Sequence, residues 1–465
     1  MNPPKMTTKK QSRREFLWKN AAGSLGAVLA PSLLSANQLT LASTETEKPA
    51  ILGGSPAWSE VRWPKWPRWV PETDEPRVLE VLRSGVWSRA GVVTEFEKEW
   101  AQTIGTKRCI ALVNGTNSLV TALGQFGIGA GDEVLVPPYT FIATVTAVLS
   151  NNAVPVFVDI DPLTYQMDPA KIEAKITPRT KAILPVHILG LPADMKRINA
   201  IAKKHNLVVI EDACQAHLAE IDGKKVGSLG DAGCFSFQNS KNLPIGEGGA
   251  IVSDNDHFID KCFSYSNLGF PYGSAVGSVT TGSVMQGTKI RFSEYQAAVG
   301  LAMLKRLDAE TTIRNENAAY LTKLIADVPG IIPQKTYPGT TRAAYHLYGF
   351  RYKSADFKGL SRNAFMQALR AEGVPCSSGY TTLNTQAFLG ATFETQTYRK
   401  IYSKKDLDVE KYYKDNRCPE NDQLCEEAVW FTQNMLLAER RDMEYIAAAI
   451  RKTYQNADKL KASLK

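Results

Sequence analysis

A lysine in a turn rich in serine, asparagine and glycine is the first feature of this chain that could do chemistry. Lys241 follows the apolar run 232–237 and precedes three glycines at positions 246, 248 and 249. Glycines allow the tight backbone geometry that brings a turn close to a ligand. A partly desolvated ammonium group loses its proton more readily, so Lys241 is a candidate Schiff-base nucleophile. The alternative for a single lysine is a solvated surface charge.

A carboxylate ends an apolar run 29 residues earlier. The run 208–211 leads directly into Asp212. In open α/β sheets, ligands bind at the carboxyl ends of the strands. An aspartate at that place can pair with a protonated pyridine nitrogen, which a pyridoxal phosphate (PLP) enzyme needs as its electron sink. Asp212 could also cap a helix over the residues that follow it.

A glycine turn at the start of a periodic apolar segment suggests an anion site. The sequence Asn-Gly-Thr-Asn-Ser at 114–118 places Gly115 and Thr116 where a helix would begin. Free amides and hydroxyls at a helix N-terminus bind phosphate, and glycine permits close approach. A plain helix cap explains the same residues.

An aromatic residue stands at a further junction between a strand-like and a helix-like run. Phe141 follows the apolar run 133–136 and the sequence Pro-Tyr-Thr. Such a ring can stack on a flat cofactor, or it can pack into the core.

These residues need a parallel sheet to bring them together. Between about residues 75 and 325, short apolar runs alternate mostly with helix-like stretches, a pattern typical of a parallel sheet with crossover helices. The runs that predict strands are 109–113, 133–136, 154–158, 182–185, 208–211, 232–237 and 250–253. The stretches that predict helices are 118–126, 141–150, 169–176, 193–205 and 311–326.

The pattern changes after about residue 330. A strand over 345–352 and helices over 361–373 and 441–454 predict a smaller α+β domain, while the polar, aromatic stretch 380–428 predicts a long loop or insertion. We therefore divide the chain into an N-terminal segment 1–46, a large domain 47–327 and a small C-terminal domain 328–465. Residues 58–69, with four tryptophans and two prolines, predict an extended arm that packs on the body or on a second subunit.

The composition is that of a globular protein, with 44% hydrophobic and 22% charged residues. The net charge of +8 is concentrated at the N-terminus, since residues 1–44 carry six basic side chains and one acidic one. The rest of the chain has only a small excess of positive charge, which argues against a surface that binds nucleic acid. The seven cysteines form no C-x-x-C pair, so we expect no metal site; Cys418 and Cys425 could bridge a short loop or remain buried thiols.

The N-terminal segment resembles an export signal. Paired arginines at positions 13 and 14, a modestly apolar stretch 21–34 and small residues up to 42 follow in the order of a twin-arginine signal. The apolar stretch is too short for a stable membrane span. We expect export to the periplasm if this signal is used, and a cytoplasmic protein if it is not. An amphipathic N-terminal helix is the alternative.

Together the motifs resemble the DegT/StrS family of PLP-dependent sugar aminotransferases, over about residues 50–455. The most specific stretches are 210–215 and 235–249, supported by 131–137, 185–187 and 291–298. The resemblance implies an α/β fold like that of aspartate aminotransferase (PLP fold type I) and a homodimer. It implies that Lys241 forms the covalent link to PLP, that Asp212 pairs with the ring nitrogen and that Gln215 approaches the ring hydroxyl. It also implies that Phe141 stacks on the ring, and that the phosphate is bound by Gly115, Thr116 and Ser236.

One position departs from the family pattern. The family usually has an asparagine two residues before the arginine of an Arg-Met-x-Glu segment, and the neighbouring subunit supplies it to the phosphate. Here Lys289 occupies that position, and Phe292 replaces the methionine. Lys289 either contacts the phosphate as a point charge or alters substrate binding.

The resemblance implies ping-pong transamination, in which glutamate or glutamine gives its amino group to a keto-sugar or keto-cyclitol. The stretches 56–58, 236–239 and 417–430 also resemble the 3-amino-5-hydroxybenzoate (AHBA) synthase branch. One rival is a PLP-dependent sugar dehydratase, but the related dehydratases carry histidine where Lys241 stands. The other is a protein of this fold that binds a ligand without catalysis.

Overall fold

The computed structural model describes residues 47–57, 63–275 and 282–464. The predicted twin-arginine signal lies outside the described residues. Within the described part of the chain, no helix is both long and apolar enough to cross a membrane, and no group of three or more His, Cys, Asp or Glu side chains is placed to hold a metal ion.

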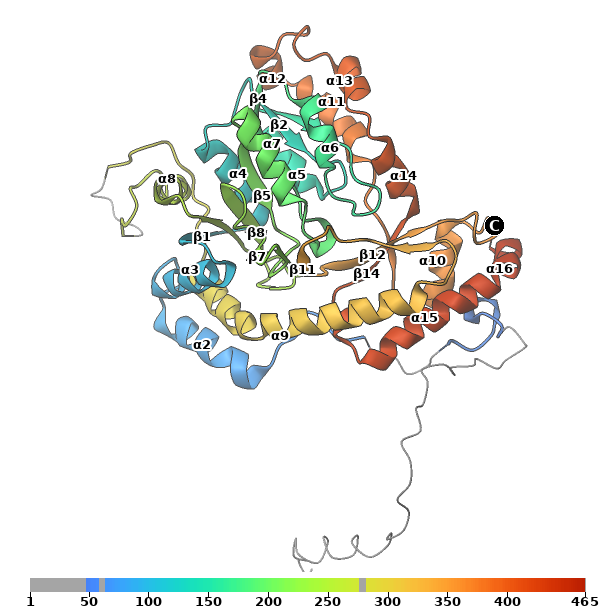
Figure 1. The fold of residues 1–465 in the computed structure, drawn as a ribbon. Coiled ribbons are helices and arrows are strands. Elements are labelled where there is room, and N and C mark those ends of the chain that lie inside the picture. The colour runs from blue at the N-terminus through green and yellow to red at the C-terminus, as the bar shows by residue number, and fades with distance from the viewer. Residues whose placement is uncertain (1–46, 58–62, 276–281, 465) are drawn as a thin grey trace, which may run out of the picture. The chain divides into compact units, whose positions relative to one another are not determined.

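A seven-stranded sheet forms the core of residues 108–253 (Figure 1). Its strand order is β1-β9-β8-β5-β4-β2-β3. Strand β9 runs antiparallel to β1 and β8, whereas the other four pairings are parallel. The strands are β1 (Arg108–Leu112), β2 (Glu133–Val136), β3 (Val154–Phe157), β4 (Thr180–Ile183), β5 (Val208–Asp212), β8 (Ala232–Ser236) and β9 (Gly249–Ser253). All seven predicted strands are therefore confirmed, each within two residues at either end.

Helices cover both faces of this sheet, which explains why its strands read as continuous apolar runs. One face packs against α4 (Gly115–Gln125), α5 (Ile142–Ser150) and α8 (Asp256–Ser266). The other face packs against α3 (Gly91–Ile104), α7 (Met195–His205) and the first half of α9 (Glu294–Ile325). The remaining helical elements before α9 are η1 (Ala50–Leu52), α2 (Pro71–Ser84), α6 (Pro169–Ile172), η2 (Glu173–Lys175) and η3 (Ile188–Gly190), of which η1 packs against the C-terminal core.

The long helix α9 connects the two parts of the chain. It has 32 residues and starts at a capping box formed by Ser293 and Gln296. Figure 1 shows it running from α2 and α3 to the C-terminal sheet and α15. The helix predicted over 311–326 is thus only the second half of a longer one.

The C-terminal part contains a four-stranded antiparallel sheet, in the order β10-β12-β14-β13. Its strands are β10 (Ile331–Pro333), β12 (Leu347–Tyr352), β13 (Ser377–Ser378) and β14 (Ala428–Thr432), and its helices are α10 (Arg362–Ala371), η5 (Met435–Leu437), α15 (Arg440–Gln455) and α16 (Ala457–Ser463). A small separate sheet joins β6 (Glu220–Ile221), β7 (Lys224–Lys225) and β11 (Thr340–Arg342).

The loop predicted over 380–428 is largely helical, which corrects that expectation. It forms η4 (Leu383–Thr385), α11 (Ala387–Phe393), α12 (Gln396–Ile401), α13 (Val409–Asp415) and α14 (Pro419–Glu427). Its aromatic side chains, including Phe393 and Tyr398, pack into the core of the seven-stranded sheet. Each helix is too short to show a clear apolar period, so the pattern was hidden. The C-terminal segment therefore contributes to both cores, and a domain division at 327/328 stays a prediction.

All seven cysteines are free, and Cys418 and Cys425 are both buried. Of the two alternatives for this pair, the structure has the buried thiols and no bridge.

Candidate active site

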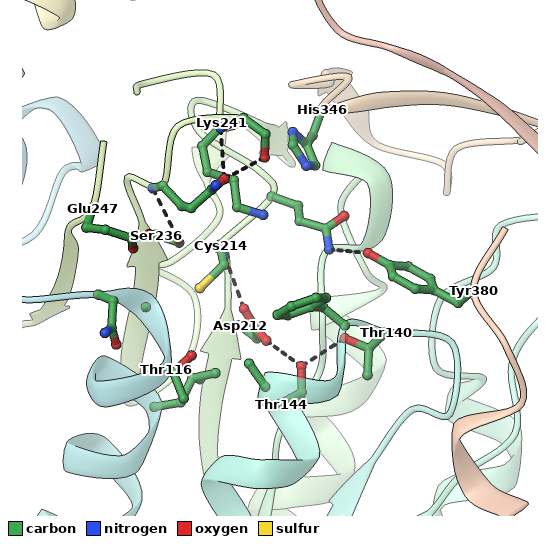
Figure 2. Close-up of a pocket in the computed structure, with 18 residues that line it drawn as sticks. Thr116, Thr140, Thr144, Asp212, Cys214, Ser236, Lys241, Glu247, His346 and Tyr380 are labelled. Atoms are coloured by element: carbon green, nitrogen blue, oxygen red, sulfur yellow. Dashed lines mark hydrogen bonds between the residues drawn. The ribbon is translucent and has the colours of Figure 1, made fainter. Parts of the chain in front are cut away.

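A cavity of about 500 Å³ opens where strands β5 and β8 end and helices α4 and α5 begin (Figure 2). This is the carboxyl edge of the parallel strands, where ligands bind in such sheets. The predicted site residues Gly115, Thr116, Phe141, Asp212, Gln215, Ser236 and Lys241 all line it. Residues that lie more than 120 positions apart in the sequence thus meet in one pocket.

The Asp212 carboxylate lies on the floor of the cavity, at the end of β5. Thr144 Oγ1 donates a hydrogen bond to Asp212 Oδ2 at 2.8 Å, and the Cys214 amide donates to Oδ1 at 3.2 Å. No helix begins after Asp212, so the helix-cap alternative is wrong. The carboxylate keeps acceptor capacity toward the cavity, because an ionised aspartate has about four lone-pair sites.

The Gln215 side chain is held at both ends of its amide. Gln215 Oε1 accepts a hydrogen bond from the Leu189 amide at 3.0 Å, and Gln215 Nε2 donates to the Tyr380 hydroxyl at 3.0 Å. Burial raises the pKa of Tyr380, and the hydrogen bond from Gln215 opposes that rise. The amide of Gln215 retains one N–H for a ligand in the cavity.

The N-terminus of α4 closes one end of the cavity. Asn114 caps the helix by accepting from the Asn117 amide at 2.8 Å. The first amides of a helix have no carbonyl partner within it, so those of Gly115 and Thr116 can bind an anion. A Cβ on Gly115 would lie 2.7 Å from Ser236 Cβ and 2.9 Å from Cys214 Sγ. Only glycine therefore allows α4 to start this close to the end of β8.

Lys241 reaches the cavity from the turn after β8, opposite α4 and α5 (Figure 2). Its amide donates to the Gln238 carbonyl at 2.8 Å. Desolvation lowers the pKa of its ammonium group, while nearby Cys214 and Asp212 act in the opposite direction. A lysine in this setting loses its proton more easily than one at the surface, as a nucleophile or a general base requires.

The remaining two predicted residues differ in their placement. Phe141 is the N-cap residue of α5 and lines the cavity, with 56% of its surface exposed. This exposure contradicts the core-packing alternative and leaves the ring free to stack. Lys289 is exposed and does not line the cavity in this chain.

Several lining residues were not identified from the sequence. Thr140, Thr144, Tyr380 and His346 all face the cavity. Thr140 and Thr144 hydrogen-bond each other at 2.8 Å, four residues apart, a spacing that could have indicated a shared site. Tyr380 and His346 come from the C-terminal part, and no local pattern marks them.

His346 is the one of these four side chains that is buried with a ring nitrogen, Nδ1, that has no hydrogen-bond partner. Desolvation holds its pKa well below the usual value, helped by the charge of Lys241. The ring is therefore neutral at physiological pH.

Comparison with known proteins identifies the family of this chain. The sequence profile of the DegT/DnrJ/EryC1/StrS aminotransferase family matches residues 70–451. The chain belongs to this family. It is an aminotransferase, and the predicted family and class of enzyme are confirmed.

Named relatives cover nearly the whole aminotransferase. An L-glutamine:2-deoxy-scyllo-inosose aminotransferase of Streptoalloteichus tenebrarius is 36% identical over 89% of this chain and 99% of its own. An L-glutamine:scyllo-inosose aminotransferase of Streptomyces griseus is 35% identical over 87% of this chain and 97% of its own.

Solved structures confirm the predicted fold class of the aminotransferase. The crystal structure of AHBA synthase has a TM-score of 0.75 and 30% identity, and the match covers 85% of this chain and 99% of that one. An aminotransferase from Psychrobacter cryohalolentis has a TM-score of 0.75 and 31% identity, with 85% and 100% covered. The chain thus has the α/β fold of PLP fold type I enzymes.

The residues of the aminotransferase fit the cofactor that the family implies. The cavity offers a carboxylate for a ring nitrogen, a lysine with a lowered pKa, and helix-terminal amides for a phosphate. Gly115 lets the N-terminus of α4 lie close to the end of β8, which leaves the helix-terminal amides free to bind a phosphate.

Proposed function

We propose that this aminotransferase uses PLP to move the amino group of glutamine, or glutamate, to a ring ketone of a polyhydroxylated carbocycle. Both relatives named above are glutamine-dependent enzymes that act on inosose ketones, which supports this donor and this class of acceptor. The cavity supports it too, since Gln238, Ser240 and Glu247 add polar side chains that can bind hydroxyl groups.

Each end of the cofactor has residues to hold it. Lys241 would carry PLP covalently, Asp212 would pair with the ring nitrogen and Gln215 would approach the ring hydroxyl. Phe141 would stack on the ring, and the phosphate would lie among the α4 amides of Gly115 and Thr116 and the Ser236 hydroxyl. When bound, the cofactor supplies an electron sink for the charge left on the donor carbon.

The chain's own contribution to the chemistry is proton transfer by Lys241. Once the amino donor has displaced it, Lys241 Nζ takes the proton from the donor's α-carbon as a general base. In the second half-reaction Lys241 Nζ delivers a proton to the former carbonyl carbon of the acceptor. Asp212, held by Thr144, would keep its charge directed at the ring nitrogen of the bound cofactor.

The observation that carries the proposal is the meeting of Lys241 and Asp212 in one cavity (Figure 2). The test is to incubate the purified protein and PLP with L-glutamine and either scyllo-inosose or 2-deoxy-scyllo-inosose. The proposal expects an aminated ring and one equivalent of the keto acid of glutamine. A product that has lost water without gaining nitrogen would favour the dehydratase, and binding without any product would favour the ligand-binding protein.

We also propose a homodimer in which Lys289 serves the partner's site. The exposed, apolar Leu79, Leu82 and Trp87 lie on and after α2 and support an interface. Lys289 is exposed and away from the cavity of its own chain, which is consistent with a role across the interface. Sedimentation velocity tests the dimer directly, and a monomer with full activity would rule it out.

Export by the N-terminal segment is a separate proposal. Arg13 and Arg14, followed by the modestly apolar stretch 21–34, support a twin-arginine signal. Residues 1–46 fused to a reporter should send it to the periplasm, and replacing both arginines by lysine should retain it in the cytoplasm. Equal distribution of the two fusions would contradict export by this route.

A further inference from the structure

The tryptophan- and proline-rich segment makes specific contacts that surface packing would not require. Here the arm means residues 63–70, which are the described part of the predicted arm 58–69 and the residue that follows it. Trp63 Nε1 donates to the Gly373 carbonyl at 2.9 Å, and Asn434 Nδ2 donates to the Pro64 carbonyl at 2.7 Å. Trp66 Nε1 instead donates to the carbonyl of Lys241 at 3.1 Å. The arm thus links the C-terminal part to the residue that the chemistry depends on.

The indole of Trp66 is itself held firmly. The guanidinium carbon of Arg314 lies 5.2 Å from the centre of the Trp66 ring, a cation–π contact. Arg314 is fully buried, and its Nε and Nη2 donate to Gln433 Oε1 at 2.9 and 2.7 Å. A buried cation on α9, fixed by a residue after β14, therefore sets the position of the Trp66 N–H.

Both backbone polar groups of Lys241 have hydrogen-bond partners. Its amide donates to Gln238, and its carbonyl accepts from Trp66. These two bonds fix the Cα from which the long lysine side chain extends into the cavity. Their importance is greatest after the amino donor has displaced Lys241, because the backbone then holds the free lysine at one end only.

We propose that Trp66 is a positioning residue that fixes the Lys241 turn so that the free lysine lies within reach of the donor's α-carbon. The inference rests on the proposed role of Lys241 as proton carrier. A displacement of about 1 Å in a reacting group lowers rates markedly, so loosening this turn should slow proton transfer.

The test compares Trp66→Phe with the matched control Trp63→Phe in the holoenzyme. Each variant keeps an aromatic ring in the arm and removes one indole N–H, but only Trp66 contacts Lys241. Three quantities are measured: the hydrogen–deuterium exchange of amides over 236–245, the rate of the glutamine half-reaction, and the isotope effect on that rate when the α-carbon carries deuterium.

We expect Trp66→Phe to exchange faster over 236–245 and to react about 2- to 12-fold more slowly, the equivalent of one lost hydrogen bond. Its deuterium isotope effect should exceed that of the wild type, because proton transfer becomes more rate-limiting. Trp63→Phe should match the wild type in all three. Equal exchange and equal isotope effects in the two variants would overturn the inference. A wild type that does not react with glutamine would instead refute the proposed function, while the exchange data would still decide whether Trp66 fixes the turn.

Discussion

Thr144 Oγ1 and Asp212 Oδ2 lie 2.8 Å apart on the floor of the cavity, and this hydrogen bond joins the first turn of α5 to the end of β5. Thr140 extends it to a short chain of hydroxyl groups. The carboxylate that we propose faces the cofactor is therefore oriented by a neighbouring helix as well as by its own strand.

Replacing Thr144 by valine should lower kcat/KM about tenfold or more, since a hydrogen bond to a charged group is worth ~1.5–3 kcal/mol. Thr144→Ser should retain most of the activity. The matched control is Thr146→Val on the same helix, whose hydroxyl bonds only the Ile142 carbonyl. Steady-state kinetics of the three variants check the prediction, and equal losses in the two valine variants would contradict it.

Asp212→Ala should remove most of the activity while the fold survives. A nearby opposite charge shifts the pKa of a group by roughly 1–3 units. Without the Asp212 carboxylate, the pyridine nitrogen of the cofactor should therefore lose its proton. We therefore expect a loss of about 10- to 1000-fold in kcat. The absorbance spectrum of the bound cofactor should change with it. Normal rates with an unchanged spectrum would show that Asp212 has no role at the ring.

His346→Phe should lower kcat/KM by about 2- to 12-fold, since it removes the polar ring nitrogens of a side chain that lines the cavity but keeps a similar ring. Burial holds the pKa of His346 well below 6.5, so the ring is already neutral across pH 6–8. The pH profile of kcat/KM in that range should therefore have the same shape in variant and wild type. An ionisation near pH 6.5 that disappears in His346→Phe would show that the histidine titrates there.

Lys289→Ala should weaken PLP binding by about 1.5–3 kcal/mol if the lysine contacts the phosphate across the dimer. The effect should shrink as salt is raised, because screening weakens the charge term at an exposed site. Lys289→Asn should restore much of the affinity through an amide donor. Equilibrium titration with PLP measures the affinity of the wild type and of both variants. Unchanged affinity in Lys289→Ala would show that Lys289 is a solvated residue that does not contact the phosphate.

The sequence predicted the seven-stranded sheet well because its signals are local. Each strand, such as 133–136, is a continuous apolar run between turn residues, and the seven predicted residues of the cavity lie at the ends of such runs or in the turns that follow. Motif resemblance added their roles, which periodicity alone could not give. Lys289 is the predicted residue that the cavity of its own chain does not include.

What the sequence did not predict depends on contacts between distant segments. His346 and Tyr380 enter the cavity from the C-terminal part, and Trp66 reaches Lys241 across 175 positions. The helices between 387 and 427 are short and polar on their exposed sides, so their burial against the large sheet becomes visible only when Phe393 and Tyr398 are seen in its core. No local pattern specifies such pairings.

The central claim is that Lys241 carries the proton in a glutamine-dependent half-reaction. It is tested most directly by mixing the purified holoprotein with L-glutamine in the absence of any acceptor, and by counting the keto acid released per active site. The account predicts one equivalent from the wild type, with a shift of the visible absorbance band. Lys241→Ala should still bind PLP but react at least ~10³-fold more slowly, in line with the loss of a general acid–base. Release of the keto acid by Lys241→Ala at the wild-type rate, or no release by the wild type, would contradict the account.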